Sequence, residues 1–422
     1  MKNVVILIII AIVLTVNVFA QSLTHVIGRP TGFASMNGGT TGGEGGPIVT
    51  VTNEAELKAA VDGVNTPVII LVRGTINVGG ELSARGNKTI VGLGTDARIA
   101  GGGFAWNTKS NVIIQNITFE DASDDLIKIN NKSKNFWIDH CTFSDGAGTN
   151  AGSHDGMLDI TRGSEFITVS YCRFFNHDKN ILIGHSDGET GDVIMKVTLN
   201  HNWFDGTVQR NPRVRYATVH LYNNYHVNNR IYGVASACNA KVLVENSYFK
   251  DTPIPLQVGV PGFSPAGFLV QRGCYFENCG TPQLKEFDTT GLIPYEYTLD
   301  NVMYVPCIAL TYAGAAKPHK TAANFSCVAV IPGGQTSTDF VKDAISEMSF
   351  KQGMLVFKHG KTSPAEIRIM NIDGRTLDIP FRGWVEAGVE NRLPLRFDHL
   401  SPGMYVIQMT TNEGVTSLKI VR

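Results

Sequence analysis

The chain has 422 residues, of which 43% are hydrophobic and 17% are charged, a balance typical of a globular protein rather than a disordered one. The formal net charge is −1, because 36 Lys and Arg residues oppose 37 Asp and Glu residues. A chain without a strong overall field has no general attraction for nucleic acid or anionic lipid. We therefore expect no nucleic-acid partner, and any recognition of charge must be local.

The first twenty residues have the pattern of a secretory signal peptide. Lys2 precedes the apolar run Val4–Val16, and Ala20 ends a small-residue cleavage site ahead of Gln21. No later stretch approaches 18 consecutive apolar residues, so no membrane span is expected. The sequence thus predicts a signal peptide over 1–20 and a secreted protein, extracellular or held at the cell surface, which we expect to be a monomer.

The next predicted element is a short helix in the stretch TVTNEAELKAAVDG at 50–63. Asn53 is a good N-cap residue, and Glu56 follows three positions later, as in a capping box. Because the pattern that follows is a stack of strands with an open end, we expect this helix to cover that end.

A loose repeat then dominates the chain. Each unit is an alternating apolar run that ends in a polar residue, two more residues and an aromatic, as in VIIQNITF or VTLNHNWF. Units of this kind end at Phe119, Phe143, Phe174, Phe204, Phe249 and Phe276. The stretch VHLYNNY, ending at Tyr225, fits less well. Short strands that keep one internal register across inserts of variable length are typical of a solenoid.

The repeat predicts a right-handed parallel β-helix, because the inserts show no helical periodicity. Equivalent residues of successive coils should stack inside it, Phe on Phe and Cys141 on Cys172. Ladders of amide side chains are expected at Asn116, Asn202, Asn224 and Asn246. The seven cysteines are odd in number and irregular in spacing, so no disulfide framework is required, although an exported protein permits a pair such as Cys274 and Cys279.

Four polar segments lie among the repeats: WIDH at 137–140, HDGMLDITRGS at 154–164, HDKNILIGHSD at 177–187, and VQRNPRVRYATVHLYNNY at 208–225. In this order they closely resemble the pectate lyases of polysaccharide lyase family 1, and the resemblance extends over 33–315. It implies the same parallel β-helix, over 21–330, and an enzyme that cleaves polygalacturonate, or demethylated pectin, by β-elimination to unsaturated oligogalacturonides.

The carboxylates of these segments predict a cation site. Asp155 and Asp159 are four residues apart and Asp139 lies one coil earlier, so stacked coils can bring the three to one surface. Close carboxylates repel and need protons or a cation, and oxygen ligands favour Ca²⁺. The resemblance implies the same three residues as calcium ligands. The alternative is that they only cap turns. Asp124 and Asp125 are expected to line a loop near the same face, and a calcium contact from Asp125 is left open.

Lys179, Arg210 and Arg215 supply the positive charge that a uronate polymer requires, since a guanidinium can hold a carboxylate with two parallel hydrogen bonds. The resemblance implies Arg210 as the base that removes the C5 proton, and Lys179 and Arg215 as substrate-binding residues. An arginine base favours an alkaline optimum, because arginine is normally protonated. Arg213 is expected to be structural. His154, His177 and His185 are alternative bases, but in the lyase interpretation they are structural.

Three rival functions are weighed against this one. A polygalacturonase-type hydrolase shares the fold, and SDDLIKI at 123–129 faintly resembles its paired aspartates, but its Arg-Ile-Lys element is missing. A non-catalytic β-helix carbohydrate-binding protein would have no need of the charged residues together. A pectin lyase, which acts on methylated polymer, characteristically lacks the calcium carboxylates.

After a linker over 331–349, a different all-β pattern fills 350–422. The pieces IMNIDGRTL, LSPGMYVIQMTTNEG and LKIVR resemble the C-terminal sorting domain of proteins exported by the type IX secretion system. This resemblance implies a small C-terminal β-sandwich and the type IX secretion machinery as a partner. The alternatives are a carbohydrate-binding or a merely stabilising sandwich.

Overall fold

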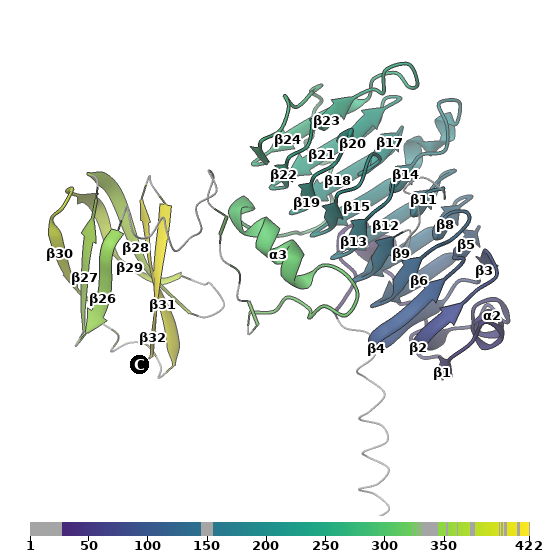
Figure 1. Cartoon of the computed structure of the whole chain (residues 1–422), viewed down its shortest axis with the longest axis horizontal. Helices are drawn as coiled ribbons and strands as arrows, with labels where there is room; N and C mark the ends of the chain where they lie inside the picture. Colours follow the sequence, from purple (N-terminus) through teal and green to yellow (C-terminus); the bar gives the residue numbers. More distant parts are fainter. Residues whose placement is uncertain are drawn as a thin grey trace, which may run out of the picture. The chain divides into compact units, whose positions relative to one another are not determined.

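The computed structural model describes residues 28–144 and 155–421, except 323, 326, 328, 331–344, 352, 361, 372–375, 396, 398–399, 401–402 and 412–413. The predicted signal peptide and His154 lie outside these residues, as does most of the predicted linker. The chain divides into two compact units with the boundary between His319 and Lys320. The first unit is a parallel β-helix, as the repeat predicted (Figure 1).

The β-helix contains a 17-stranded sheet and an eight-stranded sheet, in which all strand pairs are parallel. The long strand β4 joins two stacks within the 17-stranded sheet, because its first half pairs with β6 and its second half with β7. The first stack comprises β1 (Ile48–Val51), β2 (Val68–Asn77), β4 (Lys88–Ala100), β6 (Ser110–Gln115), β9 (Lys134–Asp139), β12 (Glu165–Ser170), β15 (Lys196–Asn200), β18 (Thr218–Tyr222), β21 (Lys241–Glu245) and β24 (Phe268–Arg272). The second stack adds β7 (Thr118–Glu120), β10 (Thr142–Ser144), β13 (Arg173–Phe175), β16 (Trp203–Asp205), β19 (Tyr225–Val227), β22 (Tyr248–Lys250) and β25 (Tyr275–Glu277).

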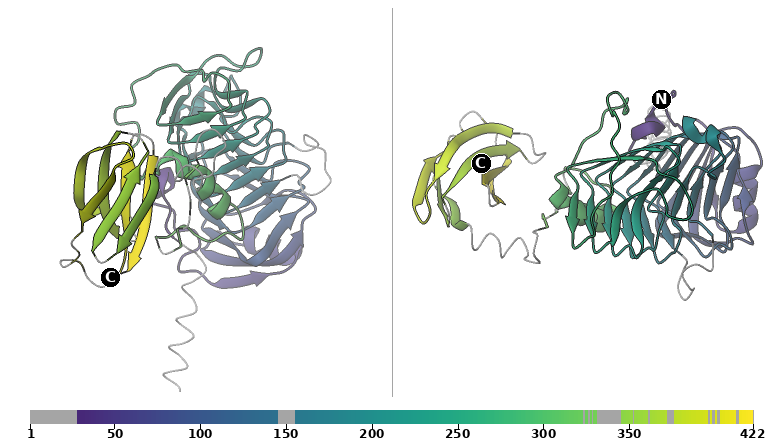
Figure 2. Two further views of the ribbon diagram at one scale, coloured as in Figure 1. Left: turned by 60° about the vertical axis from the view of Figure 1, so that its left-hand side comes forward. Right: turned by 90° about the horizontal axis from the view of Figure 1, so that it is seen from above.

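The eight-stranded sheet forms the remaining face of the solenoid, and its strands stack coil by coil in chain order. They are β3 (Leu82–Ser83), β5 (Phe104–Asn107), β8 (Ile127–Asn130), β11 (Leu158–Ile160), β14 (Ile181–Ile183), β17 (Arg213–Arg215), β20 (Tyr232–Ala237) and β23 (Ile254–Val258). Figure 2 shows the coils piled on one another along the first unit. Alternate residues of each strand point inward, so one apolar core runs the length of the unit.

The aromatic positions of the repeat form a stacked column inside the solenoid, as predicted. Ring centroids of Phe119, Phe143, Phe174 and Phe204 follow one another at 5.3, 4.8 and 5.2 Å, with the ring planes nearly parallel. The next ring is His226, not Tyr225, since His226 pairs in register with Phe204 and stacks on it at 4.6 Å. The weakest repeat unit was therefore assigned one residue too early.

A second column of polar contacts lies beside the aromatic one. The backbone N–H of Cys141 donates to Cys172 Sγ (3.4 Å), and that of Cys172 to Asn202 Oδ1 (2.9 Å). Asn202 Nδ2 donates to Asn224 Oδ1 (3.0 Å), and Asn224 N to Ser247 Oγ (3.2 Å). The cysteine stack and the Asn202–Asn224 pair are thus confirmed.

Two members of the predicted amide ladder lie elsewhere. Asn116 Nδ2 donates to Gly92 O (2.8 Å), and Asn246 Nδ2 donates to Asp300 O (2.8 Å), so both tie turns to other segments. Cys274 and Cys279 are free thiols, so the pair that the sequence permits is not formed.

The predicted helix is α2 (Glu54–Asp62), and Asn53 Oδ1 accepts from Glu56 N (3.0 Å) as the capping pattern requires. Its buried residues Leu57 and Val61 join the core at the first coils. Ahead of it, the 3₁₀ helix η2 (Gly32–Ser35) lies on the 17-stranded sheet, where Phe33 N donates to Thr198 Oγ1 (3.0 Å). The other short helices are η3 (Thr190–Ile194), η4 (Val302–Tyr304) and α3 (Val305–Tyr312).

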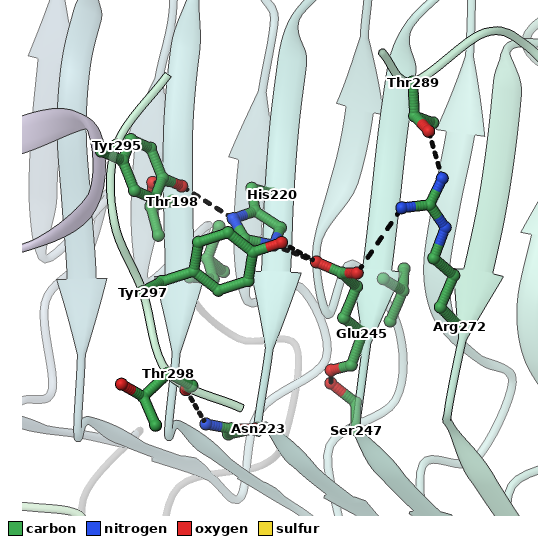
Figure 3. Close-up of polar contacts among 12 residues, drawn as sticks. Thr198, His220, Asn223, Glu245, Ser247, Arg272, Thr289, Tyr295, Tyr297 and Thr298 are labelled. Atoms are coloured by element: carbon green, nitrogen blue, oxygen red, sulfur yellow. Dashed lines mark hydrogen bonds and ion pairs between the residues drawn. The ribbon is translucent and has the colours of Figure 1, made fainter. Parts of the chain in front are cut away.

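An extended segment that follows the last coil returns across the 17-stranded sheet and is held by the polar network of Figure 3. His220 lies between Tyr295 OH (2.8 Å) and Glu245 Oε2 (2.9 Å), and Tyr297 OH donates to the same carboxylate (2.7 Å). Tyr295 OH also contacts Thr198 Oγ1 (2.7 Å). All three ring systems are tied to strands, so we assign this network to stability rather than to chemistry.

The second unit is an antiparallel β-sandwich. One sheet contains β26 (Ile345–Lys351), β27 (Met354–His359) and β30 (Glu390–Pro394), and the other contains β28 (Ser363–Asn371), β29 (Thr376–Val385), β31 (Met404–Thr411) and β32 (Gly414–Val421). Its core includes Leu355, Ile367 and Ile407 and shares no residue with the core of the β-helix. Within the described ranges, no helix combines the length and apolar character needed to cross a membrane.

Candidate active site

Most of the charged residues of the site lie on short loops that lead into the eight-stranded sheet. Asp125 precedes β8, Asp155 precedes β11, Lys179 precedes β14 and Arg210 precedes β17, each by two or three residues. Because these strands stack in that order and in parallel, the loops also follow one another. One charged group from each of four successive coils is thereby brought to the same edge of the sheet.

The acidic end of this row surrounds a small gap. Asp124, Asp125 and Asp155 each place a carboxylate oxygen within 4.8 Å of the others. A Cβ atom at Gly156 would lie 2.7 Å from both Asp125 Oδ1 and Asp159 Oδ1, so only glycine fits between these carboxylates. Gly156 N donates to Asp125 Oδ1 (2.7 Å), whereas the buried Asp159 Oδ1 has no hydrogen-bond partner. An unsatisfied buried oxygen among carboxylates is suited to a hard cation.

The electrostatics of the cluster support the same interpretation. Burial raises the pKa of Asp159 well above the usual range of a carboxyl group, and the charge of Asp125 raises it further. Burial also raises the pKa of Asp125, although Lys128 opposes this effect. The pKa of Asp155 is lowered, because Lys179 Nζ donates to its Oδ1 at 2.9 Å. The two buried carboxyl groups therefore resist ionisation unless a cation joins them.

Asp139, the third predicted calcium ligand, is not part of this cluster. It ends β9 in the 17-stranded sheet, whereas Asp159 lies in the eight-stranded sheet. Its buried carboxylate accepts from Ser170 Oγ (2.6 Å) and Gln115 Nε2 (3.0 Å), and Oδ2 lies 2.7 Å from His140 Nδ1. The expectation that Asp139 shares a site with Asp155 and Asp159 is corrected by this placement, and Asp125 stands in its place.

Lys179 and Arg210 are brought next to the acidic cluster. Residues 179 and 209 form a parallel bridge, so the two cations come from adjacent coils. Arg210 acts on the cluster from across the gap, since its charge lowers the pKa of both Asp155 and Asp159. Its Nε is buried and has no hydrogen-bond partner. Its backbone φ of 60° is in the left-handed region that residues with a Cβ rarely adopt.

Arg215 lies in β17, on the same strand as Arg213. Its Nε donates to Asp187 Oδ1 (2.6 Å), and its Nη1 is 3.4 Å from Gly184 O. Its Nη2 makes no hydrogen bond within the part of the chain that the structure describes. Arg213 is buried, and its Nη2 donates to Ser264 Oγ (2.5 Å), which in turn donates to Asp187 (2.7 Å). Arg213 thus supports the loop that orients Arg215, in line with its expected structural role.

The described histidines of these segments are tied to neighbouring groups. His177 is buried and its Nε2 contacts the backbone carbonyl of Asp155, so it fixes the loop that carries this carboxylate. His185 Nε2 lies 2.9 Å from Arg162 Nη2.

Comparison with known proteins identifies the family. The family model described as pectate lyase matches residues 1–258, and the chain belongs to the pectate lyase family and is a polysaccharide lyase. A pectate trisaccharide-lyase of Bacillus licheniformis is 34% identical over 299 residues, covering 68% of this chain and 86% of that protein. A pectate trisaccharide-lyase of Thermotoga maritima is 36% identical over 337 residues, covering 68% of this chain and 89% of that protein.

Solved structures agree with this assignment. A pectate lyase from Bacillus sp. N165, crystallised in complex with trigalacturonate, has a TM-score of 0.60 and 30% identity, and the match covers 68% of this chain and 99% of that one. A pectate lyase studied for its substrate specificity and anti β-elimination mechanism has a TM-score of 0.58 and 25% identity, covering 70% of this chain and 99% of that one. The hydrolase and non-catalytic alternatives are thereby set aside.

Proposed function

We propose that the protein is a secreted pectate lyase that cleaves polygalacturonate by calcium-dependent β-elimination. The observation that carries this proposal is the row of Asp125, Asp155, Lys179 and Arg210 on successive coils, with Asp159 below it. The row passes from two acidic groups to two basic ones along one sheet edge. A polymer with one carboxylate on every ring fits such a surface, because the basic groups can bind its carboxylates directly and the acidic groups can do so through a cation.

In this proposal the calcium ion is held by Asp125, Asp155 and Asp159. The unsatisfied Asp159 Oδ1 and the gap that Gly156 leaves open are the features that fit it. These residues would hold the ion, which would supply positive charge next to a substrate carboxylate. Asp124 is engaged by Lys128 (2.7 Å) and is assigned no ligand role.

Lys179 and Arg215 bind the substrate carboxylates. Lys179 already contacts Asp155, so a uronate group drawn to this cluster meets its ammonium. Arg215 is oriented by Asp187 and keeps Nη2 for the substrate. A cation next to the carboxylate stabilises the charge that develops on it when the neighbouring carbon loses a proton.

Arg210 is proposed as the base. It takes the proton from C5, the C4–O4 bond breaks as the C4–C5 double bond forms, and the departing O4 takes a proton from solvent. The charge of Arg210 acts on Asp155 and Asp159, so its guanidinium is near the cluster, where C5 would lie beside its carboxylate. Because arginine must first lose a proton, activity should rise towards alkaline pH.

The first test is an assay of the purified protein with polygalacturonate. We expect absorbance in the near ultraviolet to increase as unsaturated product forms, to stop on addition of a chelator, and to return with Ca²⁺. Full activity in chelator would contradict the calcium site.

Thermal unfolding of the same protein with and without Ca²⁺ tests ion binding independently of activity. The raised pKa values of Asp159 and Asp125 favour folding while these groups are protonated, and this stability is lost as pH rises through them. The stabilisation by Ca²⁺ should therefore be larger at pH 8 than at pH 5.

We also propose that the chain is exported and that the C-terminal sandwich serves as its type IX sorting domain. The β-sandwich with its own core is compatible with a domain that acts separately from the lyase. Deletion of this unit in the native host tests the assignment.

A further inference from the structure

A cleft of about 570 Å³ lies directly beside the acidic cluster, on the same face of the eight-stranded sheet. It is lined by residues of β3, β5 and β8, by the turn after β5, and by Asp62 at the end of α2. Ala105 pairs with Lys128 and Lys128 pairs with Asp159, so the cleft and the cluster occupy consecutive rungs of one sheet. Because neighbouring strands are about 4.8 Å apart, the distance from the proposed calcium site to the start of the cleft is about the length of one sugar residue.

Two cations of this cleft have free donors. Lys109 Nζ makes no ion pair or hydrogen bond within the described part of the chain. Arg85 uses only Nε, which donates to the backbone and side chain of Asp62 at 3.1 and 3.2 Å. The backbones of both are fixed, since Trp106 Nε1 donates to Arg85 O (3.1 Å) and Lys109 N donates to Ser133 Oγ (3.1 Å). Lys128, in contrast, is satisfied by Glu81, Asp124 and Asp125.

Two amides complete the donor surface. Asn107 and Asn130 are paired in register, and both line the cleft. Their side-chain oxygens are occupied, since Asn131 Nδ2 donates to Asn107 Oδ1 (2.8 Å) and Thr161 Oγ1 donates to Asn130 Oδ1 (3.2 Å). Among the described residues, neither Nδ2 has a partner. The cleft therefore offers fixed donors that lack acceptors.

We propose that this cleft is a distal subsite that binds a further uronate residue of the polymer, with its carboxylate on Lys109 and Arg85 and its hydroxyl groups on the two amides. The inference rests on the proposed function, because the same chain of uronate rings must cross the acidic cluster. An acidic ligand is favoured since charge-assisted hydrogen bonds to a fixed cation are stronger than neutral ones. A neutral sugar or a methyl ester would gain less from Lys109, because its oxygens carry no charge.

The test is a length series of saturated oligogalacturonates with the full-length protein and the variants Lys109→Ala and Lys109→Glu. We expect kcat/KM on long oligomers to fall about tenfold for Lys109→Ala and further for Lys109→Glu. The loss should appear in KM with kcat unchanged, and the shortest cleaved oligomer should be unaffected. Lys241→Ala is the matched control, because Lys241 is an exposed lysine of β21 on the other sheet without an ion pair.

Equal kcat/KM for wild type and Lys109→Glu at every length would overturn the subsite. An equal loss at all lengths would also contradict it, because the residue would then act at the site of cleavage. A loss that is the same on methyl-esterified and unesterified oligomers would assign the cleft to neutral sugar. If wild type cleaves no oligomer, the proposed function fails instead. Calorimetry with hexagalacturonate then tests the cleft alone, and unchanged binding in Lys109→Glu would overturn it.

Discussion

The backbone of Arg210 has a conformation that is intrinsically unfavourable for a residue with a Cβ atom. A φ of 60° is disfavoured by on the order of 1 kcal/mol for a residue with a Cβ, so the surrounding coils must impose it. Ile181 N donates to Arg210 O (2.8 Å) and anchors the strained residue to the coil that carries Lys179. Positive φ values recur at turns throughout the described β-helix, and at Arg210 this backbone conformation sets where the side chain leaves the coil.

Lysine substitutions of the three arginines in the segment 208–215 should have different effects on turnover, substrate binding and stability. Arg210→Lys should lose nearly all turnover while still binding polygalacturonate, because the charge remains but the proton acceptor is displaced. Arg215→Lys should mainly raise KM, since it loses the planar group that Asp187 orients. Arg213→Lys should affect stability more than chemistry. Steady-state kinetics over pH 7 to 11 with parallel melts distinguish these outcomes, and wild-type turnover in Arg210→Lys would refute the arginine base.

His226 is an imidazole in a column of phenylalanine rings. Burial lowers its pKa to about 3, although the nearby side chain of Asn229 opposes this shift. A histidine whose folded pKa is depressed contributes full stability above its unfolded pKa of about 6.5, and stability is lost as pH falls below that value. The loss amounts to about 1.4 kcal/mol per pH unit down to the folded pKa.

His226→Phe should therefore raise the melting temperature, and the gain should grow as pH falls from 7 to 5. The stacking partners Phe204 and Phe249 lie at 4.6 and 4.4 Å, so a phenyl ring continues the column. Thermal melts at both pH values measure this, with Phe204→His as the reciprocal control. A gain that does not depend on pH would show that packing, and not ionisation, limits stability at this position.

At the scale of elements, the sequence predicts which strand residues face inward but not on which sheet a strand lies. Period-two alternation located the stacked phenylalanines and cysteines, because burial follows that period in every sheet of the solenoid. Coil order and the family resemblance grouped Asp139 with Asp155 and Asp159, although β9 and β11 belong to different sheets. For the same reason, the sequence did not select Asp125 as a calcium ligand. Its position two residues before β8 is the signal, and it is visible only once β8 is aligned with β11.

The contact between the loop before β11 and the loop before β8 depends on a missing Cβ. Gly156→Ala should push Asp125 and Asp159 apart, because the new atom would lie 2.7 Å from an oxygen of each. We expect at least a tenfold rise in the Ca²⁺ concentration needed for half-maximal activity, by analogy with one lost ligand contact of about 1.4 kcal/mol. Gly188→Ala is the control, since nothing lies within 4 Å of its added Cβ. Equal calcium dependence of both variants would contradict the assignment.

The main core of the β-helix and the core of the sandwich share no residue. Removal of 345–422 should therefore leave a folded and active lyase, with a melting temperature of the first unit close to that in the full chain. In the native host the truncated chain should no longer reach the outside of the cell, because it lacks the proposed sorting domain. Activity assays and immunoblots of medium and cells measure both results. An inactive but folded truncated protein would show instead that the sandwich contributes to the site.

Stacked coils lose order from their ends, because each coil is held only by its neighbours. α2 closes the first end, and the strands that bear the site, β8, β11, β14 and β17, lie inside the pile with β20 and β23 beyond them. The outer coils must therefore unfold before these strands do. Amide exchange should accordingly be slowest around β11 and β14 and quicken towards β23 and β24. A polysaccharide-degrading enzyme built in this way could sustain partial unfolding or proteolysis of its last coils with its chemistry intact.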